Sequence, residues 1–158
     1  IKGGLRFNII PDEVELVGTI RTFDEGMRAQ VFADLKNVAE SVAKAHGATV
    51  IAQVPDTKGN PVTVNHPALT ARMVPSLEKA VGAENVVEMD LNMGAEDFSY
   101  YAREVPGFFF FVGATPRGQD PIKAPSNHSP EFFLDEEALK VGTRAMLQVS
   151  LDYLHTVD

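Results

Sequence analysis

The sequence predicts an α/β fold in two parts, and three of its patterns carry that prediction. A run of phenylalanines ending in valine, 108–112, is closed on each side by glycine, as expected of a short strand buried on both faces. Apolar and polar residues alternate over 5–9, which predicts a strand with one face in water. Apolar residues recur at helical spacing over 25–46 and 135–155, which predicts two long amphipathic helices.

The first half is predicted to be a β-β-α-β unit. Two alternating segments form a hairpin, a long helix follows, and a third strand comes after the helix. These elements are predicted at 5–9, 14–20, 25–46 and 48–54. A turn centred on Pro11 and Asp12 would place Asn8 opposite Glu15. The unit is an incomplete ferredoxin-like layer, in which a helix covers one face of a sheet.

The second half is predicted to be α/β. A polar segment rich in proline and glycine, 57–64, serves as the linker. Asn65 or His66 then caps a helix that has Pro67 in its first turn. The predicted elements are helices over 67–81, 96–103 and 135–155 and strands over 85–89 and 108–112. The chain is therefore expected to divide into 1–56, 57–64 and 65–158.

The composition is that of an acidic globular protein. The formal net charge is −8 at pH 7. Without a basic stripe to displace counterions from phosphates, neither nucleic acid nor a membrane is expected as a partner. No apolar run reaches the roughly 18 residues needed to span a bilayer, and there is no cysteine, so we expect a cytoplasmic protein without thiol chemistry. The chain begins at Ile1 rather than at methionine, and we expect it to be part of a larger protein.

The candidate metal ligand is His128. It lies in the loop between the strand predicted at 108–112 and the helix predicted from Asp135. In open α/β sheets, ligands bind beyond the carboxyl ends of the strands. Single loop histidines are more often solvated, and zinc takes about four ligands, so one imidazole cannot complete a site. If His128 binds metal, the other ligands lie elsewhere.

Three further residues are candidates for binding substrate. Gly94 precedes a predicted helix whose first N–H groups attract an anion, although a glycine there is also an ordinary turn. Asn8 and Arg21 lie on the polar face of the hairpin, which is either a solvated face or a surface where Arg21 grips a carboxylate. With Asn8 opposite Glu15, Arg21 would lie roughly 20 Å away, at 3.3 Å per residue. The two could then not hold one small substrate within one subunit.

Five short motifs follow one another along nearly the whole chain. They are Gly3-Gly4 with Asn8-Ile9-Ile10-Pro11-Asp12, Gly18-Thr19-Ile20-Arg21-Thr22-Phe23, Met93-Gly94-Ala95-Glu96-Asp97-Phe98-Ser99, Pro106-Gly107, and His128-Ser129-Pro130 with Phe132. In this order they resemble the aminoacylase/carboxypeptidase family of dinuclear metallohydrolases. The branch is that of hippurate hydrolase, indole-acetyl-amino-acid hydrolase and bacterial N-acyl-amino-acid amidohydrolases.

The resemblance implies an enzyme of two domains, a zinc-peptidase-like α/β catalytic domain interrupted by a ferredoxin-like α+β lid and dimerisation domain. Residues 1–56 would be the C-terminal part of the lid and 65–158 the C-terminal part of the catalytic domain. It also implies two divalent metal ions, zinc or manganese or cobalt, with His128 as the ligand in this chain. The general base and the other ligands are expected upstream, so the chain alone is expected to be inactive.

The function implied is hydrolysis of the amide bond of an N-acyl amino acid by a metal-activated water, in a homodimer joined through the lid. Asn8, Arg21 and Gly94 would bind the substrate. One alternative is a dipeptidase or carboxypeptidase of the same family, acting on a small peptide. The other is a non-catalytic dimerisation or binding module.

Overall fold

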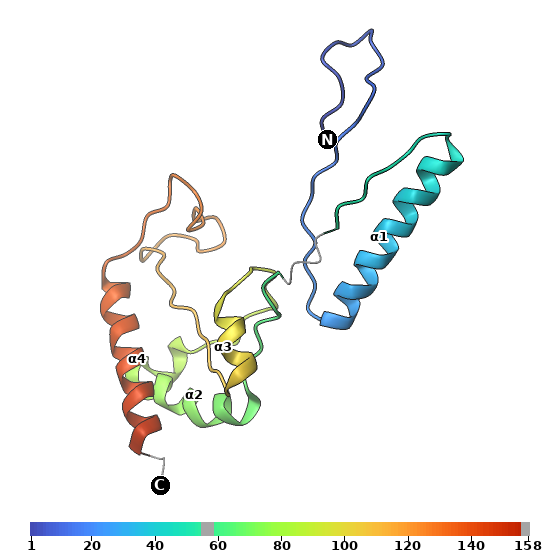
Figure 1. Cartoon of the computed structure of the whole chain (residues 1–158). Helices are drawn as coiled ribbons and strands as arrows, with labels where there is room; N and C mark the ends of the chain where they lie inside the picture. The colour runs from blue at the N-terminus through green and yellow to red at the C-terminus, as the bar shows by residue number, and fades with distance from the viewer. Residues whose placement is uncertain (55–58, 156–158) are drawn as a thin grey trace. The chain divides into compact units, whose positions relative to one another are not determined.

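The computed structural model describes residues 1–54 and 59–155 and divides into two compact units, Ile1–Val62 and Thr63–Asp158. Helices are the regular elements of both units (Figure 1). They are α1 Glu25–Ala45, α2 Pro67–Val81, the 3-10 helix η1 Ala83–Asn85, α3 Phe98–Glu104 and α4 Glu137–His155. None of these helices is long and apolar enough to cross a membrane.

Local capping signals set the ends of the helices, and the four predicted helices are confirmed to within two residues at each end. At the start of α1, the Asp24 carboxylate accepts a hydrogen bond from the Met27 amide at 2.6 Å. At its end, Gly47 adopts a φ of 68°, a left-handed conformation that favours glycine. At the start of α2, His66 Nδ1 accepts from the Leu69 amide at 3.3 Å.

The prediction of strands is wrong for the described residues. The predicted strands, at 5–9, 14–20, 48–54, 85–89 and 108–112, form no ladder there. One antiparallel bridge is present, in which Lys2 and Glu15 exchange two backbone hydrogen bonds of 2.8 Å. A strand needs a neighbouring segment to take its N–H and C=O groups, and within the described residues no segment forms more than this single bridge with them.

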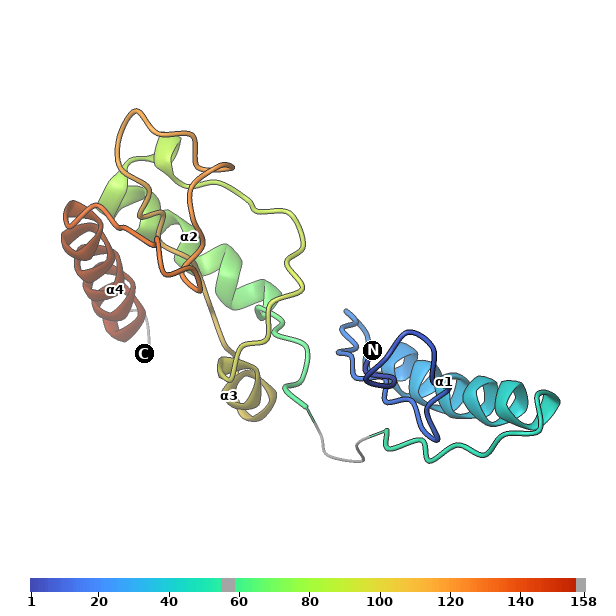
Figure 2. The ribbon, with the colours of Figure 1, turned by 90° about the horizontal axis from the view of Figure 1, so that it is seen from above.

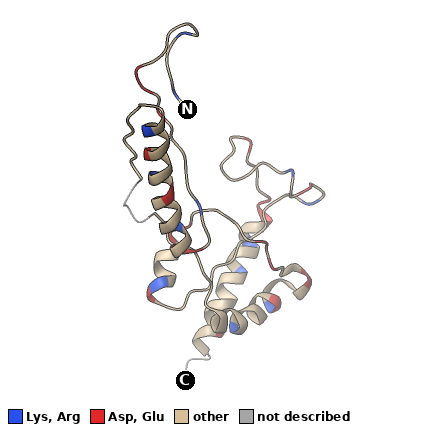
Figure 3. Cartoon of the chain, turned by 90° about the vertical axis from the view of Figure 1, so that its right-hand side faces the viewer, with Lys and Arg blue, Asp and Glu red and all other residues tan. Residues whose placement is uncertain are grey.

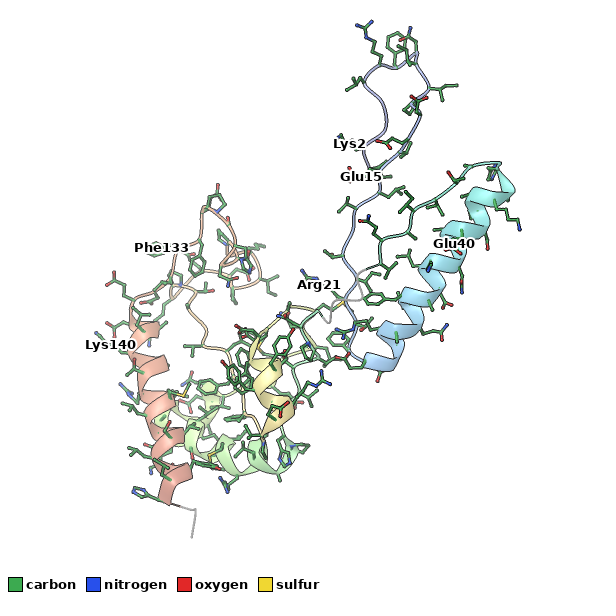
Figure 4. The ribbon with its side chains drawn as sticks, viewed as in Figure 1. Lys2, Glu15, Arg21, Glu40, Phe133 and Lys140 are labelled. Atoms are coloured by element: carbon green, nitrogen blue, oxygen red, sulfur yellow. The ribbon has the colours of Figure 1, made fainter. Side chains whose placement is uncertain are left out.

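The bridge also corrects the register predicted for the first hairpin. Glu15 lies opposite Lys2, not Asn8, so residues 3–14 form a wide loop closed at its neck by this pair (Figure 4). Leu5 and Phe7, which were expected to face a core, are fully exposed. A two-residue turn at Pro11 and Asp12 would need the flanking segments to pair along their whole length, and here only the neck is paired.

The helix α1 of the first unit has no buried residue. Its apolar positions Leu35, Val38 and Val42 are about half exposed, since the described residues form no sheet that could cover that face. Acidic and basic side chains are interspersed along α1 (Figure 3). The chain returns to the start of α1 where the Val62 amide donates to the Glu25 carboxylate at 3.1 Å.

The core of the second unit lies where α2 packs on α4 (Figure 2). Met73, Leu77 and Ala80 follow one another at helical spacing and form the buried face of α2. Ala145 is the buried residue of α4, and its small side chain lets the two helices approach closely. This helix pair is the frame from which the loops of the second unit extend.

A half-buried carboxylate joins the two helices. Asp152 of α4 accepts hydrogen bonds from Gln148 at 2.8 Å, from the Ser76 hydroxyl of α2, and from Lys79 at 3.5 Å. The hydrogen bonds from Gln148 and Ser76, followed by the charge of Lys79, hold the pKa of Asp152 below its ordinary value. All three donors favour the ionised form of this side chain.

Asp152→Asn is expected to remove part of the acid sensitivity of the second unit. Because the folded-state pKa of Asp152 is lowered, its stabilising contribution is present above the unfolded-state pKa, near about 4, and is lost as pH falls through the folded-state value. Thermal unfolding measured from neutral pH to about pH 2.5 checks this. The control is Asp12→Asn, which removes an exposed carboxylate of the first unit. If Asp152→Asn leaves the loss of stability at low pH unchanged, Asp152 does not contribute to that loss.

Candidate functional site

His128 lies in a long loop closed at its base by one backbone hydrogen bond. The Asp135 amide donates to the carbonyl of Ala114 at 2.8 Å, so that residues 115–134 form a closed excursion at the start of α4 (Figure 1). Two consecutive turns shape the segment that holds His128. In these turns the Ser129 amide donates to the Ser126 carbonyl at 2.9 Å, and the Phe132 amide donates to the Ser129 carbonyl at 3.0 Å.

These local bonds hold the backbone around His128 and leave its side chain exposed. The hydroxyl of Ser129 also accepts from the Glu131 amide at 3.1 Å, so the Ser129 side chain bonds to the backbone of its own turn. An exposed imidazole on a shaped turn can bind a metal ion or accept a proton. The sequence predicted this loop position, and the role of His128 as a ligand stays a prediction.

The described residues do not form a metal centre by themselves. No group of three or more His, Cys, Asp or Glu side chains able to hold a metal ion occurs in 1–54 or 59–155. A zinc centre takes about four ligands, and His128 supplies one. The described residues therefore do not fit a complete dinuclear site, and the remaining ligands would have to come from elsewhere.

The loop that holds Gly94 leads into α3. The Gly94 amide donates to the side-chain oxygen of Asn92 at 2.6 Å, so this N–H is engaged within the loop. Asp97 is the N-cap of α3, and Glu96 before it bonds to the first turn: its carboxylate accepts from the Phe98 amide at 3.2 Å and its carbonyl accepts from the Ser99 hydroxyl at 2.6 Å. The anion-binding role of Gly94 stays a prediction.

Asn8 and Arg21 both lie in the first unit, whereas Gly94 and His128 lie in the second. Asn8 is exposed in a turn of the loop that the Lys2–Glu15 bridge closes. Arg21 is exposed and lies outside that loop, between the bridge and α1 (Figure 4). The structure thus separates the two residues along the first unit, and their roles in binding substrate stay predictions.

One residue has a role that the sequence did not reveal. Asn65 was a candidate cap for α2, but His66 provides the cap. The side-chain amide of Asn65 instead exchanges two hydrogen bonds with the backbone of Phe109, donating to its carbonyl at 2.8 Å and accepting from its amide at 2.7 Å. Nothing in the local pattern around Asn65 indicates a partner in the phenylalanine run.

Gly107, which begins that run, is buried against α3. A Cβ atom there would lie 3.0 Å from the side chains of Ala102 and Phe98, closer than carbon atoms normally approach. The close approach explains the glycine, and it fixes where the run begins relative to α3. The carbonyl of Gly107 also accepts a hydrogen bond of 2.9 Å from the amide of His66, the residue that caps α2.

Comparison with known proteins gives one family. Residues 4–152 match the family model described as Peptidase family M20/M25/M40. Thermostable carboxypeptidase 2 of Saccharolobus solfataricus is 33% identical over 97% of this chain and 37% of its own length. IAA-amino acid hydrolase ILR1-like 4 of Arabidopsis thaliana is 36% identical over 97% of this chain and 35% of its own length. N-acetylcysteine deacetylase of Bacillus subtilis is 28% identical over 99% of this chain and 38% of its own length. The chain spans little more than a third of the curated relatives that it matches.

Proposed function

We propose, because this chain belongs to peptidase family M20/M25/M40, that it is the C-terminal portion of a metal-dependent amidohydrolase. The proposed reaction is hydrolysis of the amide bond of an N-acyl amino acid by a metal-activated water. The observation that carries the proposal is the match over 4–152, which includes all four candidate site residues. Relatives named as amino-acid conjugate hydrolase and deacetylase support this chemistry.

The proposed cofactor is a pair of divalent ions, zinc or manganese or cobalt. His128 is the ligand that this chain contributes, and its exposed imidazole is available for that role. Because the described residues form no three-ligand cluster, we propose that the other ligands and the general base lie in polypeptide outside this chain. On this basis the chain alone is inactive.

The proposed substrate contacts follow from the chemistry of an N-acyl amino acid, whose free carboxylate survives the cleavage. Arg21 carries a permanent charge and a planar fork that matches a carboxylate, and we assign it that contact. Gly94 is proposed to approach the substrate through its backbone. Asn8 is proposed to reach the active site of a second subunit, in a homodimer joined through residues 1–56 as part of a lid domain.

A second candidate is a carboxypeptidase or dipeptidase. It is favoured by the relatives named thermostable carboxypeptidase 1 and 2, which are 35% and 33% identical to this chain. The two candidates differ in the group on the acyl side of the scissile bond. An amidohydrolase takes a simple acyl group there, and a peptidase takes an amino-acid residue.

A substrate series on the full-length protein separates these functions. We expect N-acyl amino acids to be cleaved with a higher kcat/KM than dipeptides, and N-acyl amino acid amides to be cleaved about 100-fold less well because Arg21 loses its charged partner. A chelator is expected to abolish turnover, and added zinc, manganese or cobalt to restore it.

The control is this 158-residue chain, which is expected to show no turnover with any of these metals. A preference for dipeptides would establish the second candidate. Turnover that survives chelation, or turnover by this chain alone, would contradict the proposed function.

A further inference from the structure

The polypeptide that leaves the first unit is held to the first turn of α1. The Val62 amide donates to Glu25 Oε1 at 3.1 Å. Arg28 Nη1 donates to the carbonyl of Asn60 at 3.1 Å. Glu25 and Arg28 also form an ion pair with each other, in which Nη2 lies 2.6 Å from Oε2. Pro61, between the two bonded residues, is buried, so this part of the chain lies against α1 within the first unit.

The chemistry of Glu25 and Arg28 suits them to hold a backbone, and we call this pair the clamp. The guanidinium of Arg28 is a planar fork, and it bonds to Glu25 and to Asn60 through different nitrogens. Its side chain is only 19% exposed, so solvent screens this pair less than a fully exposed one. Proline has no N–H, and the clamp takes the carbonyl before Pro61 and the N–H after it.

The chain is held again where the second unit begins. Asn65 exchanges two hydrogen bonds with the backbone of Phe109, both within the second unit. Thr63 and Val64 lie between the clamped Val62 and this second anchor. Their backbones make no hydrogen bond within the part of the chain that the structure describes. Each residue has two soft dihedral angles, so few torsions are left free between the two anchors.

We infer that the Glu25–Arg28 clamp limits the free connection between the two units to Thr63 and Val64. Without the clamp, the connection would begin at Gly59 or earlier, in a segment whose composition is that of a flexible linker. The reach of a flexible chain grows as the square root of its length, so six free residues in place of two extend it about 1.7-fold. The clamp therefore restricts the range of positions open to the two units. This role goes beyond the proposed function and does not depend on it.

Distances between spin labels on the two units test the inference. The chain has no cysteine, so labels attach only at Glu40→Cys on α1 and Lys140→Cys on α4, which are both exposed positions (Figure 4). In this labelled chain, Arg28→Ala is expected to widen the distance distribution by about 1.7-fold. The matched control is Lys36→Ala, which removes an exposed cation of α1 and is expected to leave the width unchanged. Circular dichroism checks that both variants keep their helices.

Two further substitutions test the clamp and the free connection separately. Glu25→Ala is expected to widen the distribution as much as Arg28→Ala, and the double variant no further, because the two side chains act together. Val64→Pro is expected to narrow the distribution, since proline fixes its own φ and restricts Thr63 before it. Val64 is 60% exposed and its amide makes no hydrogen bond in the described structure, so this substitution leaves both anchors intact.

Three results would overturn the inference. An unchanged width in Arg28→Ala or in Glu25→Ala would show that the clamp does not hold the connection. Additive widening in the double variant would show that the two side chains act separately. An unchanged width in Val64→Pro would place the free torsions elsewhere, and this variant decides the matter even if Arg28→Ala loses its helices. None of these measurements needs turnover, so failure of the proposed function would leave the inference standing.

Discussion

His128→Ala is expected to lower both the metal content and the proposed amidase activity of the full-length enzyme by more than about 100-fold. Residues that merely orient a metal ligand change affinity or activity by about 10- to 100-fold when mutated, so loss of the ligand itself is expected to exceed that. The backbone hydrogen bonds that shape the loop do not involve the imidazole, so the substitution is not expected to alter the fold. Metal stoichiometry, kcat/KM and thermal unfolding are the measurements.

The matched control is His46→Ala. His46 follows α1 in the first unit and caps that helix through its backbone amide, so its side chain is dispensable for the cap. This variant is expected to keep full metal content and activity. A His128→Ala enzyme with unchanged metal content and rate would show that His128 is a solvated loop histidine.

If the full-length protein is the proposed homodimer, mixing its Asn8→Ala and His128→Ala variants is expected to recover about one quarter of wild-type activity from two inactive proteins. If Asn8 acts in the partner's active site, a mixed dimer holds one site with an intact His128 and an intact Asn8, and one site with neither. Random exchange makes about half of the dimers mixed, each with one working site of two. Activity is measured before and after subunit exchange.

The control for this experiment is Asn37→Ala, which removes an exposed asparagine on α1 and is expected to be fully active before mixing. It shows that any loss at Asn8 is specific to that position. If exchange is complete and no activity returns, Asn8 acts within its own subunit or has no role in the site.

The helices could be predicted from the sequence because the signals that begin and end them are local. Asp24 contacts an amide three residues away, and Gly47 closes α1 by its own conformation. Strands depend on a second segment. In the run 108–112 the rings of residues two apart contact each other, as they do in a strand. The run forms no ladder, because no backbone segment pairs along it in the described structure.

The candidate site, like the fold, could be predicted from the sequence only in part. The loop position and exposure of His128 follow from its place between an apolar run and a helix, so they could be predicted. A complete set of metal ligands could not be predicted, and the described residues hold no group of three or more His, Cys, Asp or Glu side chains able to bind a metal ion. The role of Asn65 could not be predicted either, because Phe109 lies 44 residues away in the sequence.

The hydrogen bond between Asp135 and Ala114 makes the His128 loop a module that can change independently of the helices. Both ends of the loop are held at one place, and doubling the length of a flexible loop costs only about 0.6 kcal/mol. Insertions, deletions or substitutions between 117 and 123 would then reshape the surroundings of His128 without moving the α2–α4 pair. The helical frame can therefore stay constant while this loop varies, which makes 117–123 the first region to vary in a directed-evolution library.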